Sequence, residues 1–188
     1  METQANRSPG RPRSEASRSA ILDAAYWQVM ERGYGSVTAE SIARAAGAGK
    51  QTLYRWWPSK AAVILDAIAE KERTRIDRPQ EAAIRSGDLA AFLRAVIPAI
   101  AANGQALRHL IAEAQFDAKL RATLKEKLIE PRRESLRQVL ASRALDAHQR
   151  EALIAAIFGA VWHRLLLDEP VDEALALELA ALAPAHRS

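Results

Sequence analysis

Residues 50–60 carry polar side chains of the kinds that hydrogen-bond to the edges of DNA bases. Gln51 and Arg55 lie one helical turn apart, so in a helix they would share a face. In the major groove Gln pairs best with adenine and Arg with guanine. Thr52 could bond a base or a phosphate, or touch a thymine methyl group. This spacing predicts a helix that reads base edges.

The same stretch supplies groups suited to phosphate oxygens. Lys50, Tyr54 and Lys60 can each donate a hydrogen bond to a phosphate, and so can the backbone N–H groups at the start of the next helix. Thr38, earlier in the chain, could bond a phosphate as well as cap a helix. We therefore expect these residues to contact the DNA backbone.

Two adjacent tryptophans have different expected roles. Trp57 is expected in the core, where it would pack the base-reading helix against its neighbours. Trp56 lies about one turn from Gln51 and Thr52. Two interpretations of Trp56 stay open, a contact with a sugar–phosphate or ordinary surface packing.

A helix-turn-helix over residues 38–57 would position these side chains. Ala43 is small enough for a second helix to cross close by, Gly47 permits a sharp turn, and Leu53 fills the gap between the helices. This spacing lets the second helix project into a groove about 12 Å wide. The alternative is a plain helical hairpin with a solvated polar face.

The positive charge of the chain is concentrated at its start. Residues 1–60 contain nine Lys/Arg and five Asp/Glu, whereas residues 61–188 contain eighteen of each, so all of the net charge of +4 lies in the first third. A basic end on a neutral body favours a polyanionic partner at that end. A solvated, solubilising surface is the alternative.

Residues 1–14 are rich in Arg, Pro, Ser and Gly, lack apolar periodicity, and are expected to form a flexible basic arm. The segment Gly10–Arg13 resembles the core of an AT-hook, in which Arg11 and Arg13 would enter a narrow A·T minor groove. An unstructured tail is the alternative.

The helix-turn-helix segment closely resembles the signature of TetR-family regulators. In that family a Thr is followed by Ile-Ala, a Gly, a Leu/Ile-Tyr pair, an aromatic residue and Ser-Lys. The resemblance implies that the second helix is the recognition helix and that Tyr54 and Lys60 anchor phosphates. The residues that carry it are Thr38, Ile42, Ala43, Gly47, Lys50, Thr52, Leu53, Tyr54, Arg55, Trp56, Trp57, Pro58, Ser59 and Lys60.

Two residues depart from the family signature. Ala48 stands where valine is common, and Gly49 stands where serine is common. Gly49 weakens the usual cap of the recognition helix but leaves backbone N–H groups free for a phosphate.

The fold class that follows is all-α, with an N-terminal three-helix helix-turn-helix domain, a C-terminal helical bundle, and about nine helices in total. We expect a DNA-binding domain over residues 15–76, with its first helix starting at Ser17. We expect an effector-binding and dimerisation domain over residues 77–188. The polar stretch over residues 77–88 is expected to connect them.

The C-terminal region shows no pattern typical of catalysis. The chain has no cysteine, no H-E-x-x-H, no Gly-rich phosphate loop, and no Ser-His-Asp pattern that stands out. His109 and Glu113 have metal-ligand spacing, but two residues do not make a site. We therefore expect no enzyme, no metal and no cofactor.

The last two expected helices, over residues 147–167 and 172–183, are too apolar for one small body to cover. The segment Val161–Leu167 is also similar to a TetR subgroup whose last two helices pair across a two-fold axis. Both arguments favour a homodimer, and a well-buried monomer core is the alternative. The residues expected at the dimer interface are Ile157, Phe158, Val161, Leu165, Leu175 and Leu179.

The resemblance also implies a pocket for a small apolar effector, which the sequence itself barely indicates. Side chains that could line an apolar cavity with a polar handle are Phe92, His109, Phe116 and Trp162. Ordinary core packing is the alternative for each of them.

We expect a ligand-responsive repressor that binds a palindromic operator as a homodimer, with its recognition helices about 34–36 Å apart. One alternative is a nonspecific or architectural DNA-binding protein that relies on the basic arm. Another is an enzyme or ligand-binding bundle whose helix-turn-helix is vestigial. The sequence begins without a signal peptide and contains no run of ~18 apolar residues, so we expect a soluble cytoplasmic protein without a membrane span.

Overall fold

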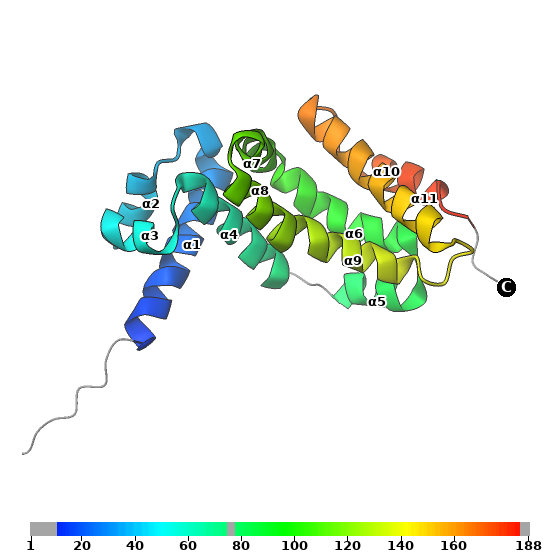
Figure 1. Cartoon of the computed structure of the whole chain (residues 1–188), viewed down its shortest axis with the longest axis horizontal. Coiled ribbons are helices and arrows are strands. Elements are labelled where there is room, and N and C mark those ends of the chain that lie inside the picture. Colours follow the sequence, from blue (N-terminus) through cyan, green and yellow to red (C-terminus); the bar gives the residue numbers. More distant parts are fainter. Residues whose placement is uncertain (1–10, 75–77, 185–188) are drawn as a thin grey trace, which may run out of the picture. The chain divides into compact units, whose positions relative to one another are not determined.

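The computed structural model describes the backbone of residues 11–74 and 78–184 and the side chains of residues 15–73 and 80–184 (Figure 1). These residues form helices joined by turns, and no strand element is present among them, so the all-α prediction is confirmed. The chain divides into two compact units between Ala67 and Ile68. This division lies inside one continuous helix and before the expected boundary at residue 76.

The first unit packs helices of 7 to 22 residues around an apolar core. Ile21, Ile42 and Leu53 are completely buried there, and α1 contacts both α2 and α3. Ser59 Oγ accepts a hydrogen bond of 3.1 Å from the N–H of Ala62 and so caps α4 as predicted. The elements of this unit are α1 (Arg11–Arg32), the 3₁₀ turn η1 (Tyr34–Ser36), α2 (Ala39–Ala45), α3 (Lys50–Trp56) and α4 (Lys60–Thr74), of which α4 continues into the second unit.

The first helix begins at Arg11, within the segment expected to be a flexible arm and before the expected start at Ser17. Pro12 stands in its first turn, where a missing N–H leaves no helical hydrogen bond unmade. Arg11 and Arg13 belong to this turn, but their side chains and residues 1–10 lie outside the described part. The AT-hook role therefore stays a prediction.

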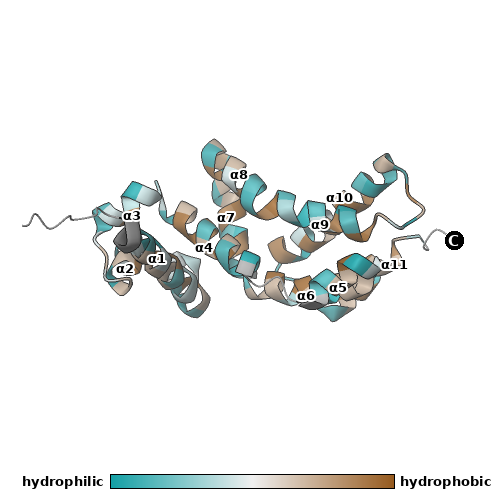
Figure 2. Cartoon of the chain, turned by 90° about the horizontal axis from the view of Figure 1, so that it is seen from below, coloured by the Kyte–Doolittle hydropathy of each residue, from teal (hydrophilic) through white to brown (hydrophobic). Residues whose placement is uncertain are grey.

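The second unit is a bundle of helices of 7 to 20 residues. Apolar residues run along α6 and α10, whereas α9 is largely hydrophilic (Figure 2). α6 packs against α5 and α11, and α9 packs against α5 and α10. The elements are α5 (Arg78–Ser86), α6 (Leu89–Ala102), α7 (Gly104–Phe116), α8 (Ala118–Leu124), the π-helical turn η2 (Lys125–Ile129), α9 (Glu130–Val139), α10 (Ala147–Leu166) and α11 (Glu173–Ala181).

The polar stretch expected to be a connector forms the helix α5. Pro79 fits in its first turn, Ala83 is buried, and Gly87 ends the helix with a φ of 68°. The long helix expected around Pro131 contains the turn η2, which ends two residues before this proline; proline cannot donate a helical hydrogen bond. For both reasons the described residues form eleven α-helices rather than about nine.

The single chain already buries five of the six residues predicted for the dimer interface, and their role at an interface stays a prediction. Ile157, Val161 and Leu165 on α10 are buried within the single chain. Leu175 and Leu179 on α11 are also buried, because α11 packs on α6. Phe158 is half-buried and lies 5.9 Å from the guanidinium carbon of Arg133. The outward face of these helices carries other residues, namely Ala152, Ala155, Ala156, Gly159, Leu166, Ala174, Leu177 and Ala181; we call this the α10–α11 apolar face.

The four residues predicted for the effector pocket differ in exposure, and the pocket stays a prediction. The Phe116 side chain is 96% exposed at the end of α7, which is incompatible with lining an enclosed cavity of one chain. His109 is exposed, and its Nδ1 lies 2.9 Å from the carbonyl oxygen of Gln105. Phe92 is buried on α6 and Trp162 is half-buried on α10.

The C-terminal end of α10 has an unusual backbone. Asp168 has a φ of 59°, a left-handed conformation that favours glycine, in a turn where the N–H of Glu169 donates to Arg164 O at 2.8 Å. The Asp168 carboxylate binds the guanidinium of Arg108 on α7, which also donates to the carbonyl oxygen of Leu165 at 3.3 Å. The ion pair between Arg108 and Asp168 thus occurs at the residue with the strained backbone.

No single described helix is long and apolar enough to span a membrane. Among the described helices, α6 and α7 reach that composition as a pair, and they are bent by 76° at their junction.

Candidate nucleic-acid interface

The entry into α2 is fixed by a reciprocal cap. Thr38 Oγ1 accepts a hydrogen bond from the N–H of Ser41 at 3.0 Å, and Ser41 Oγ accepts one from the N–H of Thr38 at 3.1 Å. The predicted capping role of Thr38 is therefore confirmed. The Thr38 side chain also forms a hydrogen bond with the Glu40 carboxylate, which contributes to the lowered pKa of Glu40.

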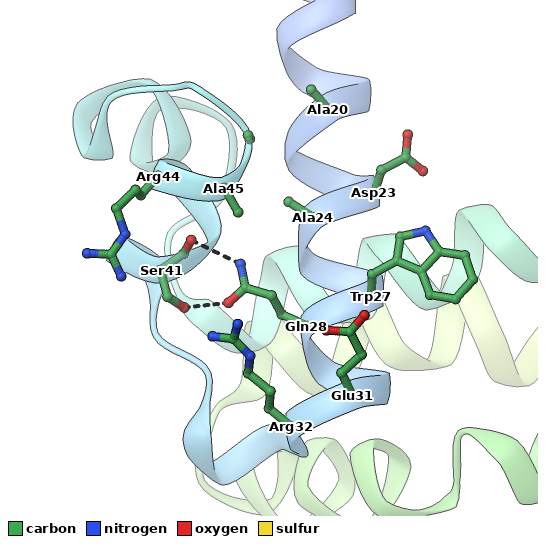
Figure 3. A pocket seen from close by; sticks show the side chains of 11 residues that line it. Ala20, Asp23, Ala24, Trp27, Gln28, Glu31, Arg32, Ser41, Arg44 and Ala45 are labelled. Carbon is green, nitrogen blue, oxygen red and sulfur yellow. Dashed lines mark hydrogen bonds between the residues drawn. The ribbon is translucent and has the colours of Figure 1, made fainter.

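A buried amide joins α1 to α2. Gln28 Nε2 donates to the backbone oxygen of Ser41 at 3.0 Å, and the Ser41 hydroxyl donates to Gln28 Oε1 at 2.7 Å (Figure 3). Gln28 was not among the residues predicted from the sequence, although a glutamine on the apolar face of an expected helix is a usable signal. Beside this pair lies a groove of about 590 Å³, lined by Ala20, Asp23, Ala24, Trp27, Gln28, Glu31, Arg32, Ser41, Arg44, Ala45 and Ala46.

The turn between α2 and α3 has the predicted geometry. Gly47 adopts a φ of 62°, and its N–H donates to Arg44 O at 3.1 Å. Ala43 and Leu53 are buried, so the two helices cross closely and are sealed by an apolar side chain. The structural part of the helix-turn-helix prediction is confirmed.

The helix α3 presents a polar face. Gln51 and Arg55 are exposed, Tyr54 is also exposed, and Thr52 is half-buried, whereas Leu53 points into the core. Gly49 precedes α3 and provides no side-chain cap, as expected. The predicted base-reading residues therefore lie together on one accessible surface.

The two tryptophans at the end of α3 differ as predicted. Trp57 is buried, and its Nε1 donates to Asp66 Oδ2 at 2.9 Å, so the indole is satisfied within the core. Trp56 is partly exposed, with its ring centroid 6.3 Å from that of Trp57. Surface packing is thus observed, and a contact with sugar–phosphate stays a prediction.

Both lysines of the candidate interface already have partners. Lys60 Nζ donates to the carbonyl oxygen of Tyr34 at 3.0 Å and lies 4.0 Å from the centroid of that ring. Lys50, at the start of α3, forms an ion pair with Glu40 on α2. Neither partner was identified from the sequence, because both lie more than one helical turn away along the chain.

Two family models match this chain. Residues 21–67 match the model of bacterial regulatory proteins of the tetR family, and residues 79–183, more than half of the chain, match the tetracyclin repressor-like C-terminal domain. The chain belongs to the TetR family. It is therefore a helix-turn-helix transcriptional regulator that binds DNA.

Individual TetR relatives agree with this assignment. The HTH-type transcriptional regulator YdeS of Bacillus subtilis is 33% identical over 169 residues, covering 84% of this chain and 82% of that protein. The crystal structure of the TetR-family regulator SCO0332 is 32% identical, with a TM-score of 0.71 over 88% of this chain and 94% of that chain. FadR of Thermus thermophilus, a repressor crystallised with lauroyl-CoA, is 18% identical and shows the shared TetR fold, with a TM-score of 0.63 over 91% of this chain and 96% of that chain.

Proposed function

We propose that this TetR regulator is a ligand-responsive repressor that binds a palindromic operator as a homodimer. The observation that carries the proposal is the exposed face of α3, where Gln51 and Arg55 stand one turn apart above the buried Leu53. A helix of this kind fits the major groove, where Gln selects adenine and Arg selects guanine. Thr52 adds a contact to a base or a phosphate.

Contacts to the DNA backbone come from residues around this face. Tyr54 is exposed on α3, and Lys60 uses one of its three N–H groups for Tyr34, leaving the others for a phosphate. Thr38 can bond a phosphate oxygen as well, once its hydroxyl leaves the Glu40 carboxylate. Lys50 has to share its ammonium group with Glu40. Contacts to phosphates fix the position of the protein along the duplex, whereas contacts to the bases select the sequence.

The homodimer is supported by the α10–α11 apolar face. Ala155, Ala156 and Gly159 are exposed along α10, and small residues let a second helix approach closely. Leu166 on α10 and Leu177 on α11 are also exposed, which leaves apolar area uncovered in one chain. A two-fold pairing through this face buries both helices of each copy.

The effector is proposed to bind in the C-terminal unit. FadR, which shares the fold, holds lauroyl-CoA, and the C-terminal unit here has the helical architecture without a pattern typical of catalysis. A small apolar ligand releases the operator only if it binds the non-operator state more tightly. A dimer that occupies the operator blocks transcription, so the proposed protein acts as a repressor in the cytoplasm.

The test begins with a duplex selected from a randomised pool by the wild-type protein. Fluorescence anisotropy at fixed salt compares this duplex with random DNA of equal length. We expect an affinity ratio of roughly 10³ or more. A ratio near one favours the architectural alternative, and absence of binding at any salt overturns the proposal.

Residue roles are tested by the double variant Gln51→Ala/Arg55→Ala. It should lose at least about 2 kcal/mol of binding to the selected duplex and little binding to random DNA, because only base contacts are removed. Arg85→Ala, an exposed arginine on α5, is the matched control and should bind as the wild type does. Equal losses on both kinds of DNA would contradict base reading by α3.

A further inference from the structure

The residues proposed to touch DNA include one cation that is already paired with an anion. The ammonium group of Lys50, the first residue of α3, is bonded to the carboxylate of Glu40 in the first turn of α2. Both side chains are about half exposed, at 53% for Lys50 and 55% for Glu40. The pair therefore lies on the accessible surface of the helix-turn-helix and not in its core.

Both groups keep their charges at neutral pH. The hydrogen bond from Lys50 lowers the pKa of Glu40, and the hydrogen bond to Glu40 raises the pKa of Lys50. Lys50 Nζ also lies 5.7 Å from the centroid of the Tyr54 ring, so the ammonium group is held beside a second proposed DNA contact. The interface thus carries the negative charge of Glu40 next to Lys50, a residue proposed to bind a phosphate.

Other cations of this interface differ from Lys50. Arg55, on the same helix, forms no hydrogen bond or ion pair with any residue that the structure describes. Lys60 donates to a neutral carbonyl oxygen, that of Tyr34. A phosphate that approaches Arg55 or Lys60 displaces no anion, whereas one that approaches Lys50 meets the charge of Glu40.

We propose that Glu40 is an internal counter-anion of the operator interface: it holds Lys50 in the unbound protein and competes with a DNA phosphate for this ammonium group. The consequence is weaker and less salt-dependent binding to the DNA backbone, with the choice of bases unchanged. Each phosphate that a protein cation neutralises releases condensed counterions, and a lysine that stays neutralised by Glu40 contributes less to this release. The inference rests on the proposed function, because it assigns a role within the same DNA-binding site.

The experiment compares salt titrations of the wild type and Glu40→Gln on the selected duplex and on random DNA. The variant should bind both about threefold tighter at low salt, the range of an exposed ion pair. The slope of log K against log salt should steepen by roughly one, so the two proteins converge as salt rises. A repeated selection with the variant should return the same base sequence.

Two further variants separate this effect from a general change of charge. Glu31→Gln, on the exposed surface of α1, removes the same charge without touching Lys50 and should change the slope much less. In a Lys50→Gln background the effect of Glu40→Gln should vanish. Circular dichroism and thermal unfolding of each variant confirm that the unit remains folded.

Several outcomes would overturn the inference. These are an equal effect of Glu31→Gln, persistence of the Glu40→Gln effect without Lys50, weaker binding by Glu40→Gln, or a changed base preference, which would mean that Glu40 itself reads a base. If the wild type binds no duplex, the proposed function falls together with this inference. If the wild type binds its selected duplex and only the Glu40 effects are missing, the proposed function stands and the counter-anion role alone is lost.

Discussion

The helix-turn-helix unit and the C-terminal unit are stabilised in different ways. In the first, α2 and α3 are seven residues each, too short to persist without partners, and specific polar contacts such as that of Gln28 with Ser41 hold them in place. In the second, the helices α6, α7 and α10, of 13 to 20 residues, pack mainly through buried apolar side chains. Short helices need particular residues at particular positions, whereas long helices need only an apolar stripe, which several partners can cover.

An ion network in the second unit lies at the surface of this apolar packing. Arg137 on α9 contacts Glu151 on α10 at 2.6 Å and Glu130 at 2.9 Å, and Arg133 contacts Glu151 at 2.5 Å. All these side chains are partly exposed, so the network adds to a position that apolar contacts have already defined. The following changes test this difference, from the largest expected effect to the smallest.

The largest effect is expected from Leu165→Ala in the second unit. Leu165 is 6% exposed, so its truncation should lower the free energy of unfolding by about 3 kcal/mol. Its neighbour Leu166 is 58% exposed, and Leu166→Ala should cost less than about 1 kcal/mol in the monomer while weakening dimerisation. Urea unfolding and sedimentation over a range of protein concentrations measure the two effects. If Leu165→Ala and Leu166→Ala lowered the stability of the monomer equally, this would contradict the observed orientation of α10.

A smaller effect is expected from Gly47→Ala in the turn of the first unit. A Cβ at this position meets no atom within 4 Å, so the change acts only through the backbone φ of 62°. The left-handed conformation should cost roughly 1–2 kcal/mol of unfolding free energy. Gly35→Ala, which also meets no atom within 4 Å and lacks a positive φ, is the control and should be close to neutral. Thermal unfolding distinguishes these results.

The cap of α2 gives the next effect. Thr38→Ala removes the hydrogen bond to the N–H of Ser41 and should cost about 1 kcal/mol, whereas Thr38→Ser keeps the oxygen and should cost less. Hydrogen exchange should show faster opening in α2 and unchanged protection in α9 and α10. An equal loss of amide protection in α2, α9 and α10 would contradict the proposed difference in how the two units are stabilised.

The smallest effect concerns the ion network of the second unit. Hydrogen bonds from Arg137 and Arg133 lower the pKa of Glu151 to about 2. Because the unfolded pKa is about 4.3, the ionised carboxylate stabilises the fold above that pH, and this contribution is lost as the pH falls towards about 2. Glu151→Gln should therefore flatten the decline of stability between about pH 5 and 2, as measured by urea unfolding. Glu126→Gln, outside the network, should leave the decline unchanged.

The sequence predicted the first unit better than the second. Thr38, Gly47 and Leu53 have local roles that follow from residue type and spacing, and the structure agrees with each. The roles of Glu40 and Gln28 could not be predicted in this way, because their partners are reached only through the tertiary fold. In the C-terminal unit the sequence predicted the apolar stripe of α10. It did not predict which face of α10 is buried by other helices of the same chain. Residues such as Leu165, expected at a dimer interface, are therefore found buried within the single chain.

The turn after α10 links two positions that are far apart in the sequence. Asp168 occupies a backbone conformation that glycine adopts at lower cost, and its carboxylate is held by Arg108. Among homologous proteins, loss of this arginine should therefore be accompanied by glycine or asparagine at position 168, whereas a glycine there leaves position 108 free to drift. A change of Asp168 to glycine is therefore tolerated before Arg108 is replaced, whereas replacement of Arg108 first is not. Comparison of homologous sequences should show the two substitutions in that order.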